Sequence, residues 1–164
     1  VLDTCDQAGW KPSYPEHLGV LAEGLAGLRR SAEAVVTIDL ALAEADHGGE
    51  RWYVAELLRI KGEILPHDAG CNSISAAEGC FREALRQARK QGALAWELRT
   101  SISLARLKVR QGWRDDARQI LEPVYQRFTE GFETADLCSA RTMLEALKEC
   151  RGVESPTGII PFLD

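Results

Sequence analysis

The sequence lacks any apolar run long enough to cross a membrane, since no stretch approaches twenty residues without a charge. It also lacks a segment in which polar and apolar residues alternate as they do in a half-buried strand. The chain begins at Val1, and no charged stretch followed by an apolar one opens it, so no signal peptide is indicated. With 45% hydrophobic and 27% charged residues, the 164-residue chain has the composition of a soluble globular domain. We expect it to be a piece of a longer protein.

Cysteine is sparse and scattered. The five cysteines are an odd number, and no two of them form a C-x-x-C pair, so neither a disulfide framework nor the usual zinc scaffold is indicated. His67 and Cys71 lie close in sequence and could ligate a metal, but an ordinary loop is the favoured interpretation. We predict reduced thiols, a cytoplasmic location, no metal and no cofactor.

The motifs of common catalytic sites are missing as well. There is no G-x-x-x-x-G-K-[ST] loop to hold a phosphate, no G-x-S-x-G turn and no H-E-x-x-H pair. Asp115 and Asp116 fall at a predicted helix start, where negative charge offsets the helix dipole. We therefore predict no catalytic residues and no enzyme activity in this chain.

The net charge of −5 argues against nucleic acid as the main partner. Its distribution is uneven, because residues 82–118 carry ten basic and four acidic side chains, whereas residues 1–81 carry six and thirteen. The basic residues of this segment are Arg82, Arg86, Arg89, Lys90, Arg99, Arg106, Lys108, Arg110, Arg114 and Arg118. A solvated helical face is the favoured interpretation; a docking patch for an acidic partner and a nucleic-acid site are the alternatives.

Apolar residues recur at three- and four-residue spacing along nearly the whole chain, which predicts an all-α fold. The predicted helices span about 15–28, 31–47, 51–65, 75–91, 93–111, 114–128 and 134–150. Ser31 is expected to cap the second helix, and Ser75 with Glu78 to form a capping box for the fourth. Pro123 should kink the sixth helix, and Thr134 can cap the seventh.

The helices pair into a repeat. A small residue in the first helix of a pair is followed twelve residues later by alanine, then by a bulky residue after four and a small one after three more. The first and third pairs match with Ala22, Ala34, Ile38 and Ala41, and with Ala105, Ala117, Leu121 and Val124. The second pair matches with Gly62, Ala77, Phe81 and Ala84, after three extra loop residues. We call Ala22, Gly62 and Ala105 the crossing residues, because small side chains let two helices approach closely there.

This is the pattern of tetratricopeptide repeats, with departures. The crossing residues lie 40 and 43 apart, whereas the standard repeat has 34 residues. The usual tryptophan, four residues before the crossing residue, is replaced by Leu18, Leu58 and Ser101, and Lys61 and Lys108 stand where apolar residues are expected. We expect tetratricopeptide-like pairs with longer helices.

Three segments carry a resemblance to a known family: GERWYVAELLRIKGE at 49–63, CFREALRQARKQG at 80–92 and LEPVYQRFTEGFETADL at 121–137. Over about residues 15–148 the chain resembles the C-terminal tetratricopeptide region of large bacterial signalling ATPases. In those proteins a nucleotide cyclase or winged-helix DNA-binding domain comes first and an AAA-like ATPase follows. The resemblance implies a right-handed superhelix whose catalytic domains lie upstream.

The expected domain organisation has three parts. Residues 1–14 would be the remnant of a preceding repeat, and residues 151–164 a flexible tail. Between them, residues 15–150 would form helix pairs at about 15–47, 51–91 and 93–128, followed by a closing helix at 134–150.

The first helix of each pair lines the concave face in tetratricopeptide arrays. Transferring that pattern places the following partner contacts on this face: Glu56, Arg59, Glu63, Arg99, Ile102 and Arg106, joined by Glu16 and Glu23 from the first pair. The alternative is an open face whose charges are merely solvated. Trp52, Tyr53 and Trp96 are interpreted as packing between repeats rather than as a ligand-binding surface.

These features predict a non-catalytic sensor module that binds a protein or peptide through a groove of mixed charge and influences upstream domains. The alternative is a structural module for self-association, because an array without its preceding repeats has an uncovered N-terminal end, which makes a homodimer possible.

Overall fold

The computed structural model describes residues 14–48, 51–67 and 73–149, and within these ranges the chain is helical without strands. The seven α-helices are α2 (Tyr14–Gly27), α3 (Ser31–His47), α4 (Val54–Ile64), α5 (Ser73–Gln91), α6 (Leu94–Arg110), α7 (Arg114–Tyr125) and α8 (Ala135–Glu149). Two 3₁₀ helices, η1 (Arg51–Tyr53) and η2 (Leu65–His67), flank α4. The predicted all-α class is confirmed. Three expected features lie outside the described residues or side chains: the remnant before Tyr14, the tail at 151–164 and the His67–Cys71 pair.

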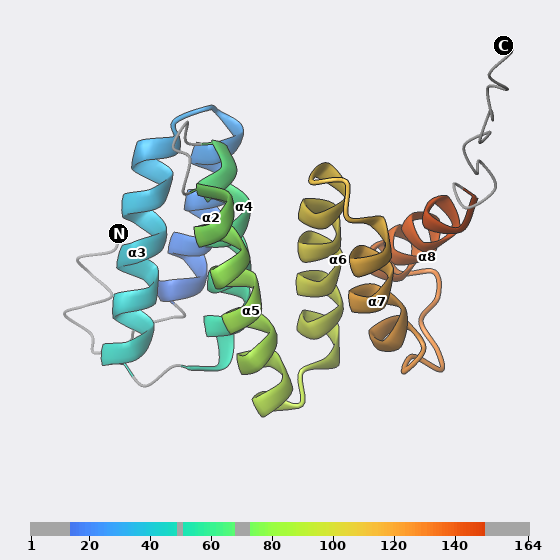
Figure 1. The fold of residues 1–164 in the computed structure, drawn as a ribbon. Coiled ribbons are helices and arrows are strands. Elements are labelled where there is room, and N and C mark those ends of the chain that lie inside the picture. Colours follow the sequence, from blue (N-terminus) through green and yellow to red (C-terminus); the bar gives the residue numbers. More distant parts are fainter. Residues whose placement is uncertain (1–13, 49–50, 68–72, 150–164) are drawn as a thin grey trace, which may run out of the picture.

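Consecutive helices pack in pairs. The most extensive packing joins α2 with α3, α4 with α5, and α6 with α7, and we call the members of each pair its first and second helix. The pairs are joined by contacts of α4 with α2 and α3, and of α6 with α4 and α5, while α8 packs on α6 and α7. The helices therefore follow one another from the α2–α3 end of the molecule to α8 at the other (Figure 1).

Three of the turns between helices share one hydrogen-bonding pattern. A residue one or two positions after the helix has a positive φ, at Arg29 (60°), Gly92 (67°) and Gly112 (84°). In each turn the next amide donates to the carbonyl five residues before it, as from Arg30 to Leu25 at 2.9 Å. This arrangement caps the last carbonyls of the helix and favours glycine. The predicted helix ends at Gly92 and Gly112 are confirmed, and Arg29 occupies the same conformation without being glycine.

Three predictions at the helix ends are wrong. Ser31 is the first residue of α3, and its N-cap is Arg30, whose side chain makes no capping bond, because the preceding turn fixes where α3 begins. The Ser75–Glu78 capping box fails because α5 begins at Ser73 and Glu78 pairs with cations instead. The helix that contains Pro123 ends at Tyr125 rather than Phe128.

The repeat pattern matches the packing at every position. All twelve residues of the pattern are buried. In the second pair the two helices approach closely, because a β-carbon on Gly62 would lie 2.5 Å from the ring of Phe81. The small residues therefore lie where the helices of a pair touch, as the sequence predicts.

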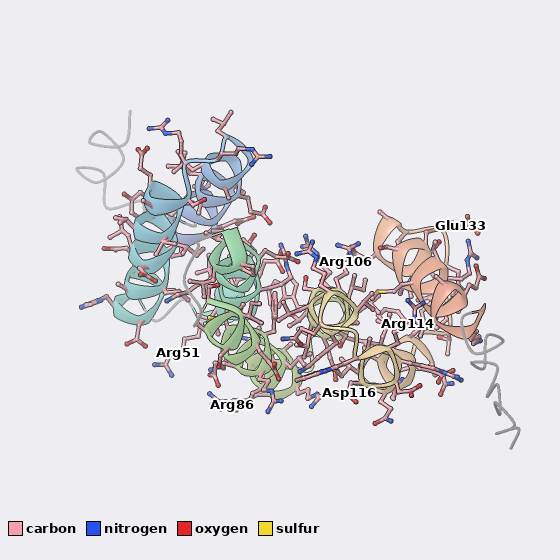
Figure 2. All side chains as sticks on the ribbon, turned by 45° about the horizontal axis from the view of Figure 1, so that its top comes forward. Arg51, Arg86, Arg106, Arg114, Asp116 and Glu133 are labelled. Atoms are coloured by element: carbon pink, nitrogen blue, oxygen red, sulfur yellow. The ribbon has the colours of Figure 1, made fainter. Side chains whose placement is uncertain are left out.

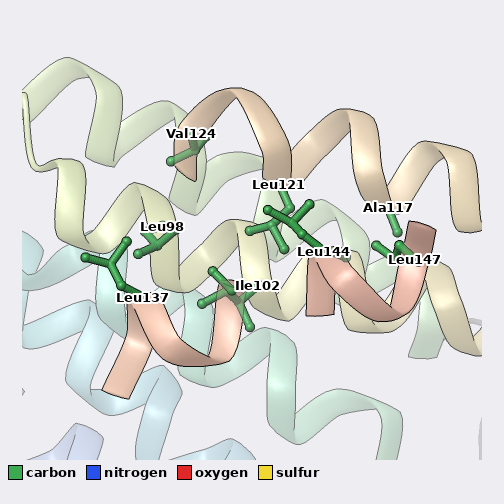
Figure 3. Close-up of a cluster of buried hydrophobic side chains, with 10 residues drawn as sticks. Leu98, Ile102, Ala117, Leu121, Val124, Leu137, Leu144 and Leu147 are labelled. Carbon is green, nitrogen blue, oxygen red and sulfur yellow. The ribbon is translucent and has the colours of Figure 1, made fainter. Parts of the chain in front are cut away.

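The core consists of three clusters of buried apolar residues. The largest joins α6, α7 and α8, where Leu137, Leu144 and Leu147 of α8 pack against residues such as Leu98 and Leu121 (Figure 3). Helix α8 thus covers the apolar side of the third pair, which would otherwise be exposed to water.

Candidate functional site

The charged residues predicted on the first helices form a chain of ion pairs. Arg59 Nη2 lies 2.8 Å from Glu23 Oε1 on α2 and 2.9 Å from Glu56 Oε1 on its own helix. Arg99 Nη1 on α6 lies 2.7 Å from the same Glu56 oxygen, and its Nε lies 3.7 Å from Asp136 Oδ2 on α8. We call this chain the ion-pair ladder; it links α2, α4, α6 and α8.

The centre of the ladder is buried. Glu56 is only 2% exposed and Arg59 7% exposed. Burial alone would lower the pKa of Arg59, but the hydrogen bonds and charge of Glu56 and Glu23 outweigh it and raise this pKa above its ordinary value. Arg59 therefore stays charged, its guanidinium is bonded to Glu56 and Glu23, and a partner cannot reach Glu56 or Arg59 in this conformation. These two predicted contacts thus become structural ion pairs.

The other predicted contacts differ in exposure. Ile102 is buried in the α6–α8 core cluster, so the prediction that it contacts a partner does not fit the structure. Glu63 and Arg99 are partly exposed, and Glu63 lies 3.8 Å from Arg59. Arg106 is exposed and donates a hydrogen bond of 2.9 Å to Ser139 Oγ. The first-helix face is thus a largely self-paired surface rather than an open charged groove.

The two lysines at apolar positions of the repeat pair with the preceding second helix. Lys61 Nζ lies 2.7 Å from Asp39 Oδ1 on α3. Lys108 Nζ lies 2.9 Å from Glu78 Oε2 on α5 and 4.3 Å from the centre of the Trp113 ring. These buried or half-buried lysines hold neighbouring pairs together.

Aromatic rings also join the second and third pairs. The ring centroid of Trp52 lies 5.2 Å from that of Tyr53 and 6.0 Å from that of Trp96, at the start of α6. Tyr53 and Trp96 meet edge to face at 5.9 Å. Burial, and then the charges of nearby glutamates such as Glu56, raise the pKa of the Tyr53 hydroxyl. The rings pack across the junction between pairs, as the sequence predicts.

An open groove of about 530 Å³ lies on the side of the array opposite the first-helix face. Residues of α5 and α7 line it, together with residues of α6, which lies between them. We call it the α5–α7 groove. Its apolar lining includes Leu85, Leu104, Ile120, Pro123 and Val124, and its charged lining Glu78, Arg82, Arg89, Glu97, Lys108 and Arg127. Figure 2 shows the two sides of the array: Arg106 lies on one side, and Arg86 and Asp116 lie on the opposite side.

The charges of this groove form two clusters, each with two cations around one carboxylate. Glu97 is buried and pairs with Arg89 at 2.7 Å and with Arg127. In the other cluster Glu78 pairs with Lys108 and with Arg82, at 2.6 Å.

Each cluster carries a net positive charge. The hydrogen bond from Lys108, followed by that from Arg82, lowers the pKa of Glu78. The guanidinium groups of Arg82, Arg89 and Arg127 are mostly exposed and have further N–H donors. The α5–α7 groove can therefore accept anionic groups beside an apolar floor.

Sequence reasoning missed this groove. Arg82, Arg89 and Lys108 belong to the basic segment, but Glu97 and Arg127 were not predicted. The lysine at an apolar repeat position was the available signal, since a buried lysine needs a carboxylate partner. Its partner could not be identified because it lies 30 residues away on another helix.

In the described part of the chain, no group of three or more histidine, cysteine, aspartate or glutamate side chains could hold a metal ion. None of the helices described is long and apolar enough to span a membrane. Comparison of the chain with models of known protein families, with curated protein sequences and with solved structures finds no match.

Proposed function

We propose that the chain is a tetratricopeptide-like right-handed superhelix of three helix pairs and a closing helix, and that it acts as a non-catalytic protein-binding module. In this proposal it belongs to a larger bacterial cytoplasmic signalling ATPase and passes on the binding of a partner to upstream domains. The burial of all twelve pattern residues supports the repeat.

The lysine pairs support the repeat independently. Lys61 lies one residue before the crossing residue of its pair, and Lys108 lies three residues after its own. The position of Lys108 in its repeat is thus four residues later than that of Lys61. The carboxylate partners are shifted in the other direction: Asp39 lies five residues after Ala34, whereas Glu78 lies one residue after Ala77. In antiparallel helices, a shift of four residues toward the C-terminus on one helix and four toward the N-terminus on the other moves a contact along both helices by one turn. The two lysine pairs are therefore the same contact, displaced by one turn. The second and third pairs therefore meet their preceding helices in the same way.

The α5–α7 groove is the binding site in this proposal, and its two positively charged clusters are the observation that carries it. We infer that its ligand is an acidic protein segment that also carries apolar side chains. Carboxylates would reach the exposed guanidinium groups of Arg82, Arg89 and Arg127, and the apolar side chains would cover residues such as Leu104 and Ile120. Because these charges are exposed, binding should weaken as salt rises.

Site-specific photocrosslinking tests this function in the native cells. A photoreactive benzoylphenylalanine replaces Gln119, which lines the groove, or Thr142, which is exposed on α8. We expect one acidic protein to crosslink at Gln119 and not at Thr142. Charge removal by Arg82→Gln with Arg127→Gln should reduce the adduct about tenfold, and neither substitution places a second carboxylate beside Glu78 or the buried Glu97.

Arg86→Gln is the matched control, because Arg86 is exposed on the same helix as Arg82 but does not line the groove. It should leave the adduct unchanged. Equal crosslinking at both positions, or an adduct that survives the charge removal, would contradict this function. Arg99 is unsuitable for such a test, because a glutamate there would lie beside the buried carboxylate of Glu56.

Self-association is the second candidate function. It is favoured by one observation, the apolar surface that α2 and α3 expose at their end of the array.

A further inference from the structure

The α2–α3 end of the array exposes a face of large apolar side chains. Val20 and Leu21 on α2 are 60% and 52% exposed, and Val36 and Leu40 on α3 are 70% and 44% exposed. We call these four residues, together with Gly24 and Leu28, the N-terminal face. It lies on the first helix pair, which has no preceding pair among the described residues.

On the first helices of the other two pairs the positions of Val20 and Leu21 are buried, except that Lys61, the counterpart of Leu21 in the second pair, is partly exposed. Val20 lies two residues before its crossing residue, and its counterpart Ile60 is 1% exposed in a cluster with residues of α3. Leu21 lies one residue before its crossing residue, and its counterpart Leu104 is 3% exposed in a cluster with residues of α5. In both inner pairs a helix of the preceding pair covers this side of the first helix. On α2 this surface has the same apolar character, but none of the described helices before α2 covers it.

The exposed residues of α3 also belong to this surface. Val36 and Leu40 lie two and six residues after Ala34 of the repeat pattern. In α7, Gln119 and Pro123 lie at the same distances after Ala117 and are therefore their counterparts. Gln119 and Pro123 line the α5–α7 groove and so face the preceding pair. The corresponding side of α3 is more apolar, because it carries valine and leucine.

The N-terminal face is uncharged and permits a close approach. Val20, Leu21, Gly24 and Leu28 follow one another at helical spacing and are uncharged, while Glu23, which lies between them in the sequence, pairs with Arg59 of α4. A β-carbon added to Gly24 would meet nothing within 4 Å, so packing inside the chain does not explain this poor helix former. A second helix that crosses α2 at Gly24 would explain it, since the crossing residue of each helix pair in the chain is alanine or glycine.

The opposite end of the array differs in character. The exposed side of α8 carries residues such as Arg141, Glu145 and Lys148, and none of its large apolar side chains is exposed. A head-to-tail contact would therefore bury apolar groups against charged ones. Two copies of the N-terminal face, by contrast, match each other in apolar character and do not repel each other.

We propose that the N-terminal face is the interface of a two-fold symmetric homodimer, in which α2 of one copy crosses α2 of the other at Gly24. The inference rests on the repeat register proposed above, but not on the ligand of the α5–α7 groove. Isologous contact of this kind is the commonest way in which soluble chains form dimers.

Light scattering during size-exclusion chromatography of the full chain, over a range of concentrations, tests the proposal. We expect the mass to rise from 18.1 kDa to twice that value as concentration increases. Leu21→Glu and Val36→Glu should each raise the dimer dissociation constant more than about tenfold, because each buries an unpaired charge in the interface. Circular dichroism should show unchanged helix content, since both side chains are exposed in the monomer.

Ile74→Glu is the matched control, because Ile74 is an exposed apolar residue of α5 outside the N-terminal face. This variant should dimerise as the unaltered chain does. Gly24→Gln should increase helix content and still weaken the dimer. The mass of one chain at every concentration, or a dimer that survives both charge substitutions, would overturn the proposal. Photocrosslinking at Gln119 of the same variants separates this result from failure of the groove.

Discussion

Gly62 of α4 lies directly against the ring of Phe81 on α5: a β-carbon on Gly62 would come within 2.5 Å of Phe81 Cε1. Because α4 has no side chain at position 62, the Phe81 ring can fill the space between α4 and α5. The contact defines the crossing point of the second pair.

Gly62→Ala should destabilise the protein by about 1–3 kcal/mol, because the ring must move out of a packed core. Alanine is the better helix former, so propensity alone predicts the opposite sign. Gly79→Ala in α5 is the control, since nothing lies within 4 Å of the added carbon, and it should stabilise by up to about 1 kcal/mol. Urea unfolding monitored by circular dichroism measures both. Equal effects of the two substitutions would refute the crossing-point interpretation.

Removing the charge of Glu56 should break the ion-pair ladder. Glu56→Gln leaves Arg59 buried without its main partner, and breaking a buried ion pair costs about 3–5 kcal/mol. Glu63→Gln should cost less than about 1 kcal/mol, because Glu63 is partly exposed and lies 3.8 Å from the same arginine. Denaturant midpoints of the two variants provide the test. A small loss at Glu56 would mean that the ladder adds little to stability.

The pair of Glu78 with Lys108 should make stability depend on pH. The hydrogen bonds from Lys108 and Arg82 hold the pKa of Glu78 below its ordinary value of 4.5. The pair therefore stabilises the folded chain above that value, and the contribution is lost as the pH falls through the lowered pKa. Glu78→Gln should cost about 1–3 kcal/mol at neutral pH, and the difference from the unaltered chain should shrink below about pH 4.

A double variant isolates this effect. In a Lys108→Met background, Glu78→Gln should cost much less, because the buried ammonium no longer needs a carboxylate. Unfolding curves at several pH values measure the coupling. A pH-independent difference between the chain and its Glu78→Gln variant would rule out the predicted linkage.

Arg29 adopts a backbone conformation that suits glycine, with a φ of 60°. Arg29→Gly should raise the stability by up to about 1 kcal/mol, because a side chain in this region is strained. In the equivalent turn after α6, Gly112→Ala should lower it by about 1–2 kcal/mol. For a chain of this size the melting temperature should shift by about 2–4 °C per kcal/mol, in opposite directions for the two variants. Shifts of the same sign would contradict the assigned turn conformation.

Much of the fold follows from local sequence. Helical periodicity, together with glycine at 92 and 112, predicts the last residue of six of the seven α-helices to within two residues, because these signals act over a single turn. The pattern around Ala22, Gly62 and Ala105 predicts the packing positions, because only small residues allow helices to touch. Errors arose where tertiary contacts outweighed local preference, as when Glu78 pairs with Lys108 rather than capping α5.

The sequence alone therefore determined that the chain is helical, where its helices lie and which residues meet inside each pair. Only the tertiary structure decided which charges are exposed. Glu56 and Arg99 lie 43 residues apart, and Glu97 and Arg127 lie 30 apart, yet each pair is in contact. Electrostatic partners depend on distance in space and on burial, which no local pattern encodes. For that reason the charged residues predicted to bind a partner instead pair with one another in the ion-pair ladder, and the open groove lies between α5 and α7.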